Sequence, residues 1–252
     1  MIERIANQPG IIVAAHRGYK SDYPENTLLA FRKSLELGVD MLEFDLRLSS
    51  DKAVMVLHDA TVDRTTNGSG KVGGFSLAEL KQLDAGSWFD PEFAGLDIPT
   101  LAELCELLRS YPDVLLNVEI KSNHDAMEAV DLTVAILKEY GYLERCVFAC
   151  FDAAVIAYLH DVYKLRTQGF PGTKMSNFVP GDAGTYSKLW AIGIEMGQLT
   201  PEIVEEYKHK GLLVWCYCPD NEAQVRHGLA CGATLMTCND PVPAMEILKQ
   251  QA

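Results

Sequence analysis

The sequence predicts an α/β protein, a single (β/α)8 TIM barrel over residues 1–252. The first observation is a rhythm in which short β-type runs alternate with amphipathic stretches, which is typical of a parallel sheet. The second is size, because 252 residues with 48% hydrophobic content suit one barrel of ordinary length. The third is continuity, since no linker or low-complexity tract divides the chain. Eight β/α units favour a closed barrel over an open sheet.

The barrel strands are expected at eight apolar, β-type runs. In chain order these are residues 11–15, 41–46, 114–120, 146–151, 165–170, 191–195, 212–217 and 233–237. Amphipathic stretches that suit helices follow most of them, at residues 27–37, 101–111, 126–140, 153–162, 201–210, 221–231 and 242–250. The segment at 171–189 has no clear helical pattern.

A long insertion interrupts this rhythm between the second strand and the second helix of the barrel. At about fifty residues it is too long for an ordinary loop, which points to a function. Residues 47–98 are therefore predicted to form a small cap. The stretch LEFDLRLSSDKAVMVLHD alternates on both sides of SSDK, as a β-hairpin does. A turn centred on Asp51 and Lys52 would place Asp45 opposite His58.

Charge and hydropathy exclude several classes of protein. The net charge is −13 with a pI near 4.9, and no Lys/Arg cluster interrupts the acidic background, so no nucleic-acid partner is expected. No apolar run approaches the roughly 18 residues of a membrane helix, and the first residues lack the apolar run of a signal peptide. We therefore expect a cytoplasmic protein without stable membrane association. A homo-oligomeric state is left open.

The seven cysteines do not indicate a disulfide framework. Their number is odd, and most lie in apolar segments such as CVFACF and VWCYC, which is typical of reduced, buried thiols. Cys216 and Cys218 fall on one strand face beside apolar neighbours, which disfavours a zinc site.

Polar residues gather at the carboxyl ends of three consecutive strands, where the active site of a (β/α)8 barrel lies. They are His16, Arg17, Glu43, Asp45, His58, Glu119 and Lys121. Residues two apart on a strand point to the same face, so Glu43 joins Asp45 and Glu119 joins Lys121. Three clustered carboxylates repel one another unless positive charge lies between them. An all-oxygen set favours a hard divalent cation such as Mg²⁺ or Ca²⁺.

Each of these residues also has a structural interpretation. A single histidine after a strand is more often a satisfied structural residue than a catalyst. Arg17 and Lys121 would neutralise Glu43 and Glu119 in a purely structural ion-pair network. The coincidence of seven polar residues at the ends of consecutive strands nevertheless favours function, because a barrel without a site should be apolar there.

The motifs of the chain resemble those of the glycerophosphodiester phosphodiesterase family, a metal-dependent group of (β/α)8 barrels. They are HRG at 16–18, PENT at 24–27, EFD at 43–45 and HD at 58–59. DRTTNGSG, IPTLAEL, NVEIK and the later VW also fit the pattern of the family. The resemblance implies hydrolysis of a small-molecule glycerophosphodiester to glycerol 3-phosphate and an alcohol, with a divalent metal as cofactor.

The resemblance also implies roles for eight residues. His16 and His58 would be the acid–base pair, Glu43, Asp45 and Glu119 the metal ligands, and Arg17, Lys121 and Trp215 the substrate-binding residues. Two histidines suit proton transfer near neutral pH, because imidazole can hold either protonation state there. Which histidine is the acid stays open.

Other functions remain as alternatives. CFD replaces the Ser-Phe expected after the fourth strand, and CYCPD replaces Thr-x-Asn after the seventh, which leaves the preferred leaving alcohol open. The alternatives are a related phospholipase D/C-type barrel acting on lysophospholipids, a barrel phosphatase or sugar isomerase, and a barrel that binds phosphate esters without cleaving them. The first nucleophile is either water or the 2-hydroxyl of the substrate. The 2-hydroxyl is favoured because it is already held beside phosphorus.

Overall fold

The structure, a computed structural model, describes residue 5 and residues 11–251. In this part of the chain one sheet of nine strands has the order β1-β9-β8-β7-β6-β5-β4-β2-β3, and an additional β1–β2 pairing closes it into a barrel. The barrel strands are β1 (Ile12–His16), β2 (Met41–Leu48), β4 (Leu115–Ile120), β5 (Cys146–Ala149), β6 (Thr167–Gly169), β7 (Ala191–Glu195), β8 (Leu213–Tyr217) and β9 (Leu235–Cys238). All eight pair in parallel, which confirms the predicted fold class.

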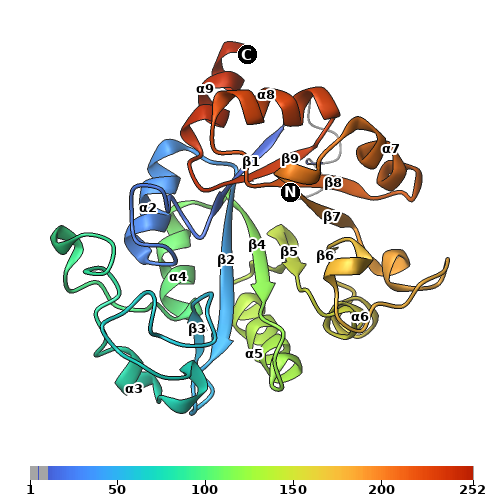
Figure 1. Ribbon diagram of the computed structural model, residues 1–252. Helices are drawn as coiled ribbons and strands as arrows, with labels where there is room; N and C mark the ends of the chain where they lie inside the picture. Colours follow the sequence, from blue (N-terminus) through green and yellow to red (C-terminus); the bar gives the residue numbers. More distant parts are fainter. Residues whose placement is uncertain (1–4, 6–10, 252) are drawn as a thin grey trace.

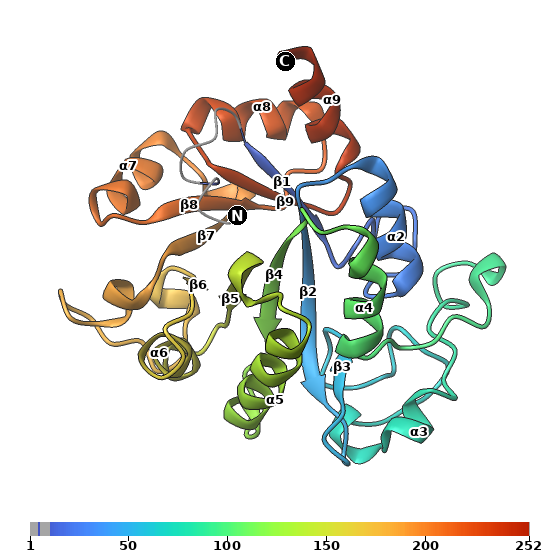
Figure 2. The same ribbon diagram turned by 180° about the vertical axis from the view of Figure 1, so that it is seen from behind.

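Helices surround this barrel, as Figures 1 and 2 show. They are α2 (Leu28–Leu37), α4 (Leu101–Leu107), α5 (Ala126–Glu139), α6 (Ala153–Asp161), α7 (Pro201–His209), α8 (Glu222–Cys231) and α9 (Val242–Gln251). Side-chain caps fix where several begin: Thr27 Oγ1 accepts from the N–H of Ala30 at the start of α2. Between β6 and β7 the structure has the 3₁₀ turns η5 (Gly172–Lys174) and η6 (Thr185–Lys188), where the sequence has no helical pattern.

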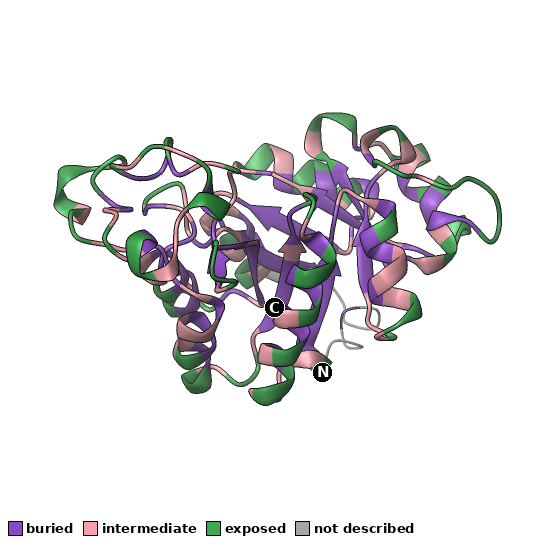
Figure 3. Cartoon of the chain, turned by 90° about the horizontal axis from the view of Figure 1, so that it is seen from below, coloured by how far each residue is buried: buried purple, intermediate pink, exposed green. Residues whose placement is uncertain are grey.

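The core has two layers. One fills the inside of the barrel and includes Ile12, Met41, Leu115, Val147 and Trp215. The larger layer lies between the strands and the helices. Figure 3 shows the strands buried and the helices exposed on their outward faces. Parallel strands that are buried on both faces read as near-continuous apolar runs, which explains why they are visible in the sequence.

The predicted hairpin forms, but its predicted register is wrong by one residue. β3 (Val54–Val56) pairs antiparallel with β2, with Leu46 opposite Val56. The N–H of Leu57 donates to the carbonyl of Asp45 at 2.9 Å, so Asp45 faces Leu57 and not His58. The N–H of Ser49 donates to Ala53, which leaves a three-residue loop that ends on Lys52 at φ 68°. The prediction assumed a two-residue turn, and the extra loop residue shifts the pairing.

The insertion after β3 has a small core of its own. It contains η1 (Val72–Gly74), α3 (Leu77–Leu80) and η2 (Pro91–Phe93). Its buried apolar residues are Met55, Leu57, Val62, Val72, Leu80, Ala85 and Ile98. In Figure 1 it lies outside the barrel beside α2 and α4. The 47–98 boundaries and the role of this segment as a cap remain predictions.

Within residue 5 and residues 11–251, no helix combines the length and the apolar character needed to cross a membrane.

Candidate active site

A pocket of about 160 Å³ opens at the carboxyl ends of the barrel strands. It is lined by His16, Arg17, Glu43, His58, Asn117, Glu119, Lys121, Ala149, Phe151, Gln168, Phe170, Tyr217 and Thr237. Six of the eight predicted site residues are therefore in its wall. A seventh, Asp45, is fully buried and forms ion pairs with two of them, Arg17 and Lys121. The polar residues of three strands and the hairpin thus converge on one place.

The strand register gathers the three predicted metal ligands. Asp45 on β2 is paired with Glu119 on β4, and Glu43 on β2 is paired with His16 on β1. One carboxylate oxygen from each of Glu43, Asp45 and Glu119 lies within 4.8 Å of the other two. Lys121 Nζ is 2.7 Å from Asp45 Oδ1 and also contacts Glu119.

The charges in this cluster are not balanced. Burial, together with the charges of Asp45 and Glu119, raises the pKa of Glu43 well above its usual range. Burial also raises the pKa of Glu119, although Lys121 opposes the shift. Burial acts in the same direction on Asp45, but the charges of Lys121 and Arg17 outweigh it and lower the pKa of Asp45. Two of the three carboxyl groups therefore have too little positive charge nearby, and an all-oxygen set of this kind fits a hard divalent cation.

His16 is held by an amide that is itself fixed. Nδ1 of His16 donates to Asn239 Oδ1 at 2.6 Å. Asn239 Nδ2 donates to Asp220 Oδ2 at 2.6 Å, which sets the orientation of the amide because a carboxylate can only accept. Nε2 of His16 lies 3.9 Å from Glu43 Oε2. Burial and the charges of Arg17 and Lys20 lower the pKa of His16 to about 3, so the ring is neutral with Nε2 as the acceptor.

Nδ1 of His58 is bound to a carboxylate, whereas Nδ1 of His16 is bound to an amide. Nδ1 of His58 donates to Asp59 Oδ1 at 2.6 Å, which leaves Nε2 for chemistry. Burial lowers the pKa of His58, and the negative charge of Asp45 opposes the shift. The two histidines therefore present the same ring nitrogen but differ in the group behind them, an amide for His16 and a carboxylate for His58.

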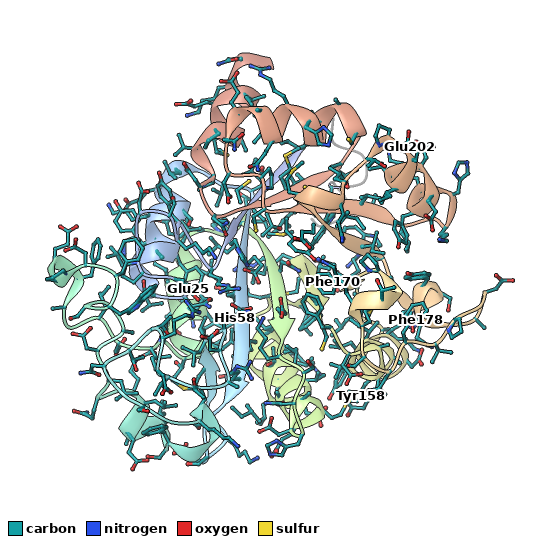
Figure 4. All side chains as sticks on the ribbon, viewed as in Figure 1. Glu25, His58, Tyr158, Phe170, Phe178 and Glu202 are labelled. Atoms are coloured by element: carbon teal, nitrogen blue, oxygen red, sulfur yellow. The ribbon has the colours of Figure 1, made fainter. Side chains whose placement is uncertain are left out.

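The opposite wall of the pocket is aromatic. Phe151 and Phe170 stack with ring centroids 3.6 Å apart, and Tyr217 meets Phe170 edge to face at 5.9 Å. Figure 4 shows His58 and Phe170 on different sides of the barrel mouth. The pocket thus has a charged side and an apolar side, which suits a small molecule with an anionic group and a carbon skeleton.

The prediction that Trp215 lines the substrate pocket is wrong. Trp215 is 1% exposed and packs in the inner barrel layer, with its ring 6.1 Å from that of Trp190. Side chains on a strand return to the same face every second residue, so Tyr217 is the next inward residue toward the carboxyl end. Tyr217 therefore takes the position in the pocket wall, and Trp215 lies one layer deeper.

Several residues of the site were not assigned a role from the sequence. Glu25 accepts from Arg17, and Asn26 Nδ2 donates to Asp45 Oδ2 at 2.8 Å. Both belong to the PENT motif, which was noted without a role. Asn239 directly follows the last strand. It could have been identified in the same way as His16, because active-site residues lie at the carboxyl ends of barrel strands. Asp59 and Arg64 also received no role, although both lie in quoted motifs.

Comparisons with known proteins agree with this geometry. A sequence profile described as the glycerophosphoryl diester phosphodiesterase family matches residues 16–242. A glycerophosphodiester phosphodiesterase of Caldanaerobacter subterraneus subsp. tengcongensis is 33% identical over 242 residues, covering 95% of this chain and 98% of the relative. One of Bacillus subtilis is 29% identical, covering 92% and 84%.

Solved structures give the same result. A glycerophosphodiester phosphodiesterase from Agrobacterium tumefaciens superposes with a TM-score of 0.79 at 27% identity, covering 94% of this chain and 99% of the other. A phosphodiesterase from Oleispira antarctica, in complex with the product sn-glycerol-3-phosphate, has a TM-score of 0.83 at 25% identity and covers 97% and 99%. The profile spans most of the chain, and the chain therefore belongs to the glycerophosphoryl diester phosphodiesterase family, as its motifs predict.

Proposed function

We propose that the protein hydrolyses glycerophosphodiesters to glycerol 3-phosphate and an alcohol, using a divalent cation and two acid–base histidines. Family membership confirms the predicted enzyme class, a phosphodiesterase. The observation that carries the proposal for the residues is the convergence of His16, His58 and three carboxylates on one pocket.

The charged side of the pocket suits a phosphodiester. Attack on this anion is slow because its oxygens repel nucleophiles, and positive charge beside them lowers the barrier. A divalent cation, Mg²⁺ or Ca²⁺, held by Glu43, Asp45 and Glu119 would supply much of that charge. Arg17 and Lys121 line the same pocket and would contact the phosphate oxygens. Glu25 and Asp45 hold the guanidinium of Arg17 in place.

The two histidines would move the protons. The leaving alcohol needs a proton and the nucleophile must lose one, so the reaction calls for an acid and a base. Since Nδ1 of each ring is already engaged, Nε2 of His16 and of His58 is the nitrogen that exchanges protons with substrate. The first nucleophile is proposed to be the 2-hydroxyl of the glycerol, because attack by a group already held beside phosphorus avoids the entropy of fixing a water.

The charged side of the pocket favours a substrate with an anionic phosphodiester group, and the glycerophosphoryl group is the part of the substrate that a pocket of about 160 Å³ accommodates. The preferred alcohol and the physiological metal stay open. A cytoplasmic location remains a prediction from the sequence, and the oligomeric state stays open.

A product analysis tests the proposal. The protein is incubated with glycerophosphocholine, glycerophosphoethanolamine or lysophosphatidylcholine in the presence of Mg²⁺ or Ca²⁺, and products are identified by ³¹P NMR. We expect glycerol 3-phosphate from the first two substrates and little reaction with the third. Phosphocholine as the product, or preferential cleavage of the lysophospholipid, would contradict the proposal. A variant that lacks both His16 and His58 is the control for contaminating activity.

A further inference from the structure

Arg64, in the insertion, forms hydrogen bonds to two carboxylates, those of Asp59 and Glu25. Its Nε and Nη2 donate to Asp59 at 2.7 and 3.1 Å. Its Nη1 and Nη2 donate to Glu25 at 2.9 and 2.8 Å. The guanidinium therefore forms two paired contacts, a geometry that the planar fork of arginine allows and the single ammonium of lysine does not. Trp88 adds a cation–π contact, with its ring centroid 5.9 Å from Arg64 Cζ.

Each of these two carboxylates also binds a residue of the pocket wall. Asp59 Oδ1, one of the two oxygens that bind Arg64, also accepts from Nδ1 of His58 at 2.6 Å. Glu25 Oε1 accepts from Arg17 Nη1 at 2.9 Å. Figure 4 shows Glu25 and His58 on the same side of the barrel mouth. One side chain of the insertion is thus linked to a catalytic histidine and to a phosphate-binding arginine.

Removing Arg64 would disturb both links. Glu25 and Asp59 contact the same guanidinium, so without it two carboxylates of like charge would be close together and would repel. Asp59 would then turn away from His58, whose ring would lose the partner that fixes its tautomer and direction. Glu25 would keep its ion pair with Arg17 and would draw that guanidinium away from the phosphate.

We propose that Arg64 is a positioning residue for phosphodiester cleavage, which orients His58 through Asp59 and Arg17 through Glu25. The proposal rests on the proposed function and adds to it a role for the insertion. The insertion then supplies the cation that keeps two groups in the wall of the pocket in their working positions. Arg64 itself does not line the pocket.

Lys81 offers a matched control within the same insertion. It also bridges two carboxylates, with Nζ 2.6 Å from Asp97 and 2.9 Å from Glu103. Neither of those carboxylates binds a residue of the pocket wall. Lys81→Ala therefore removes a comparable double ion pair, between the insertion and α4, whereas Arg64→Ala also breaks the links to the histidine and the arginine.

The test measures kcat and KM on a glycerophosphodiester at saturating divalent metal for Arg64→Ala, Arg64→Lys, Lys81→Ala and Asp59→Asn. We expect kcat to fall roughly 10–100-fold in Arg64→Ala, as is typical when a group behind a catalytic ligand is removed. Arg64→Lys should recover part of this loss, and Lys81→Ala should keep the wild-type kcat. In the double variant Arg64→Ala/Asp59→Asn, the fold loss of kcat should be smaller than the product of the losses in the two single variants. The reason is that Arg64 acts on His58 through Asp59.

A second readout does not depend on activity. In ¹⁵N-histidine-labelled protein, the ring signals of His58, assigned with His58→Ala, should show one tautomer in the wild type and in Lys81→Ala. Arg64→Ala should show a mixture of tautomers. A wild-type kcat or unchanged His58 ring signals in Arg64→Ala would overturn the role of Arg64. If the wild type cleaves no glycerophosphodiester, the proposed function fails, while the ring signals still decide the role of Arg64.

Discussion

Asp45 and Glu119 occupy paired positions on β2 and β4, so the register of the barrel itself brings two carboxylates to one level. Glu43 joins them from the same face of β2, two residues before Asp45. An arrangement that places like charges together in a buried pocket lowers stability unless a cation is bound there. The fold therefore keeps together the three carboxylates that we propose as metal ligands.

Replacing Glu119 by Gln should weaken metal binding without weakening the fold. The neutral amide removes one anionic ligand, so the affinity for Mg²⁺ or Ca²⁺ should drop roughly tenfold or more. The metal-free variant should unfold at the same temperature as the wild type or higher, because repulsion with Asp45 is relieved. Calorimetric titration and thermal unfolding measure both. Glu36→Gln, on an exposed helix surface, is the control. Unchanged affinity would show that Glu119 is not a ligand.

Glu25 should make the stability of the protein depend on pH in acid. Burial acts to raise its pKa, but hydrogen bonds and charge from Arg64 and Arg17 outweigh it and lower the pKa from 4.5 to about 2. The folded state therefore gains stability from the ionised carboxylate above pH 4.5 and loses it as the pH falls toward 2.

Glu25→Gln tests this dependence. At pH 7 the variant should be less stable than the wild type by about 3 kcal/mol, the size that such a pKa shift implies. The difference should shrink between pH 4.5 and pH 2, where the wild-type carboxylate takes up its proton. Urea unfolding at several pH values measures the free energy of unfolding. A difference that stays constant down to pH 2 would contradict the proposed charge state of Glu25.

Substitutions at Tyr217 and Trp215 should separate an effect on substrate binding from an effect on the stability of the fold. Tyr217→Ala opens the apolar wall of the pocket, so KM should rise while the unfolding temperature changes little. Trp215→Phe leaves a gap in the inner barrel layer and should destabilise the fold by about 1–3 kcal/mol, with KM unchanged. Steady-state kinetics and thermal unfolding of both variants measure this contrast. A rise in KM for Trp215→Phe alone would restore Trp215 to the substrate pocket.

A substrate without the 2-hydroxyl tests the nucleophile. If that hydroxyl attacks phosphorus first, a 2-deoxy glycerophosphodiester should bind but react at least about 10²-fold more slowly, because the advantage of an internal nucleophile is lost. Inhibition of the natural reaction measures its binding, and ³¹P NMR measures its cleavage. Turnover of the deoxy substrate near the natural rate would make water the nucleophile.

The sequence could predict the barrel and its charged rim because both depend on local rules. Buried parallel strands leave long apolar runs, and the active-site end of each strand follows from the direction of the chain. His16, Glu43 and Glu119 were found in this way and do reach one pocket.

Features that depend on exact geometry could not be predicted. The hairpin register was wrong because one more residue in the loop shifts every pair, and the sequence does not show that Ser50 belongs to the loop. Trp215 was assigned to the pocket from the family resemblance, and a short motif does not give the depth of a side chain in the barrel. The link from Arg64 to Glu25 joins residues 39 apart in the sequence, so no spacing rule indicates it.

The most direct test of the account combines metal removal with loss of each histidine. Protein treated with a chelator is assayed for release of glycerol 3-phosphate from glycerophosphocholine before and after Mg²⁺ or Ca²⁺ is added, alongside His16→Ala, His58→Ala and, as a control, the exposed His124→Ala. The account predicts activity only with metal, normal activity for His124→Ala, and a loss of roughly 10²–10⁴-fold for each of the other variants. Full activity after metal removal, or a wild-type rate in either His16→Ala or His58→Ala, would contradict it.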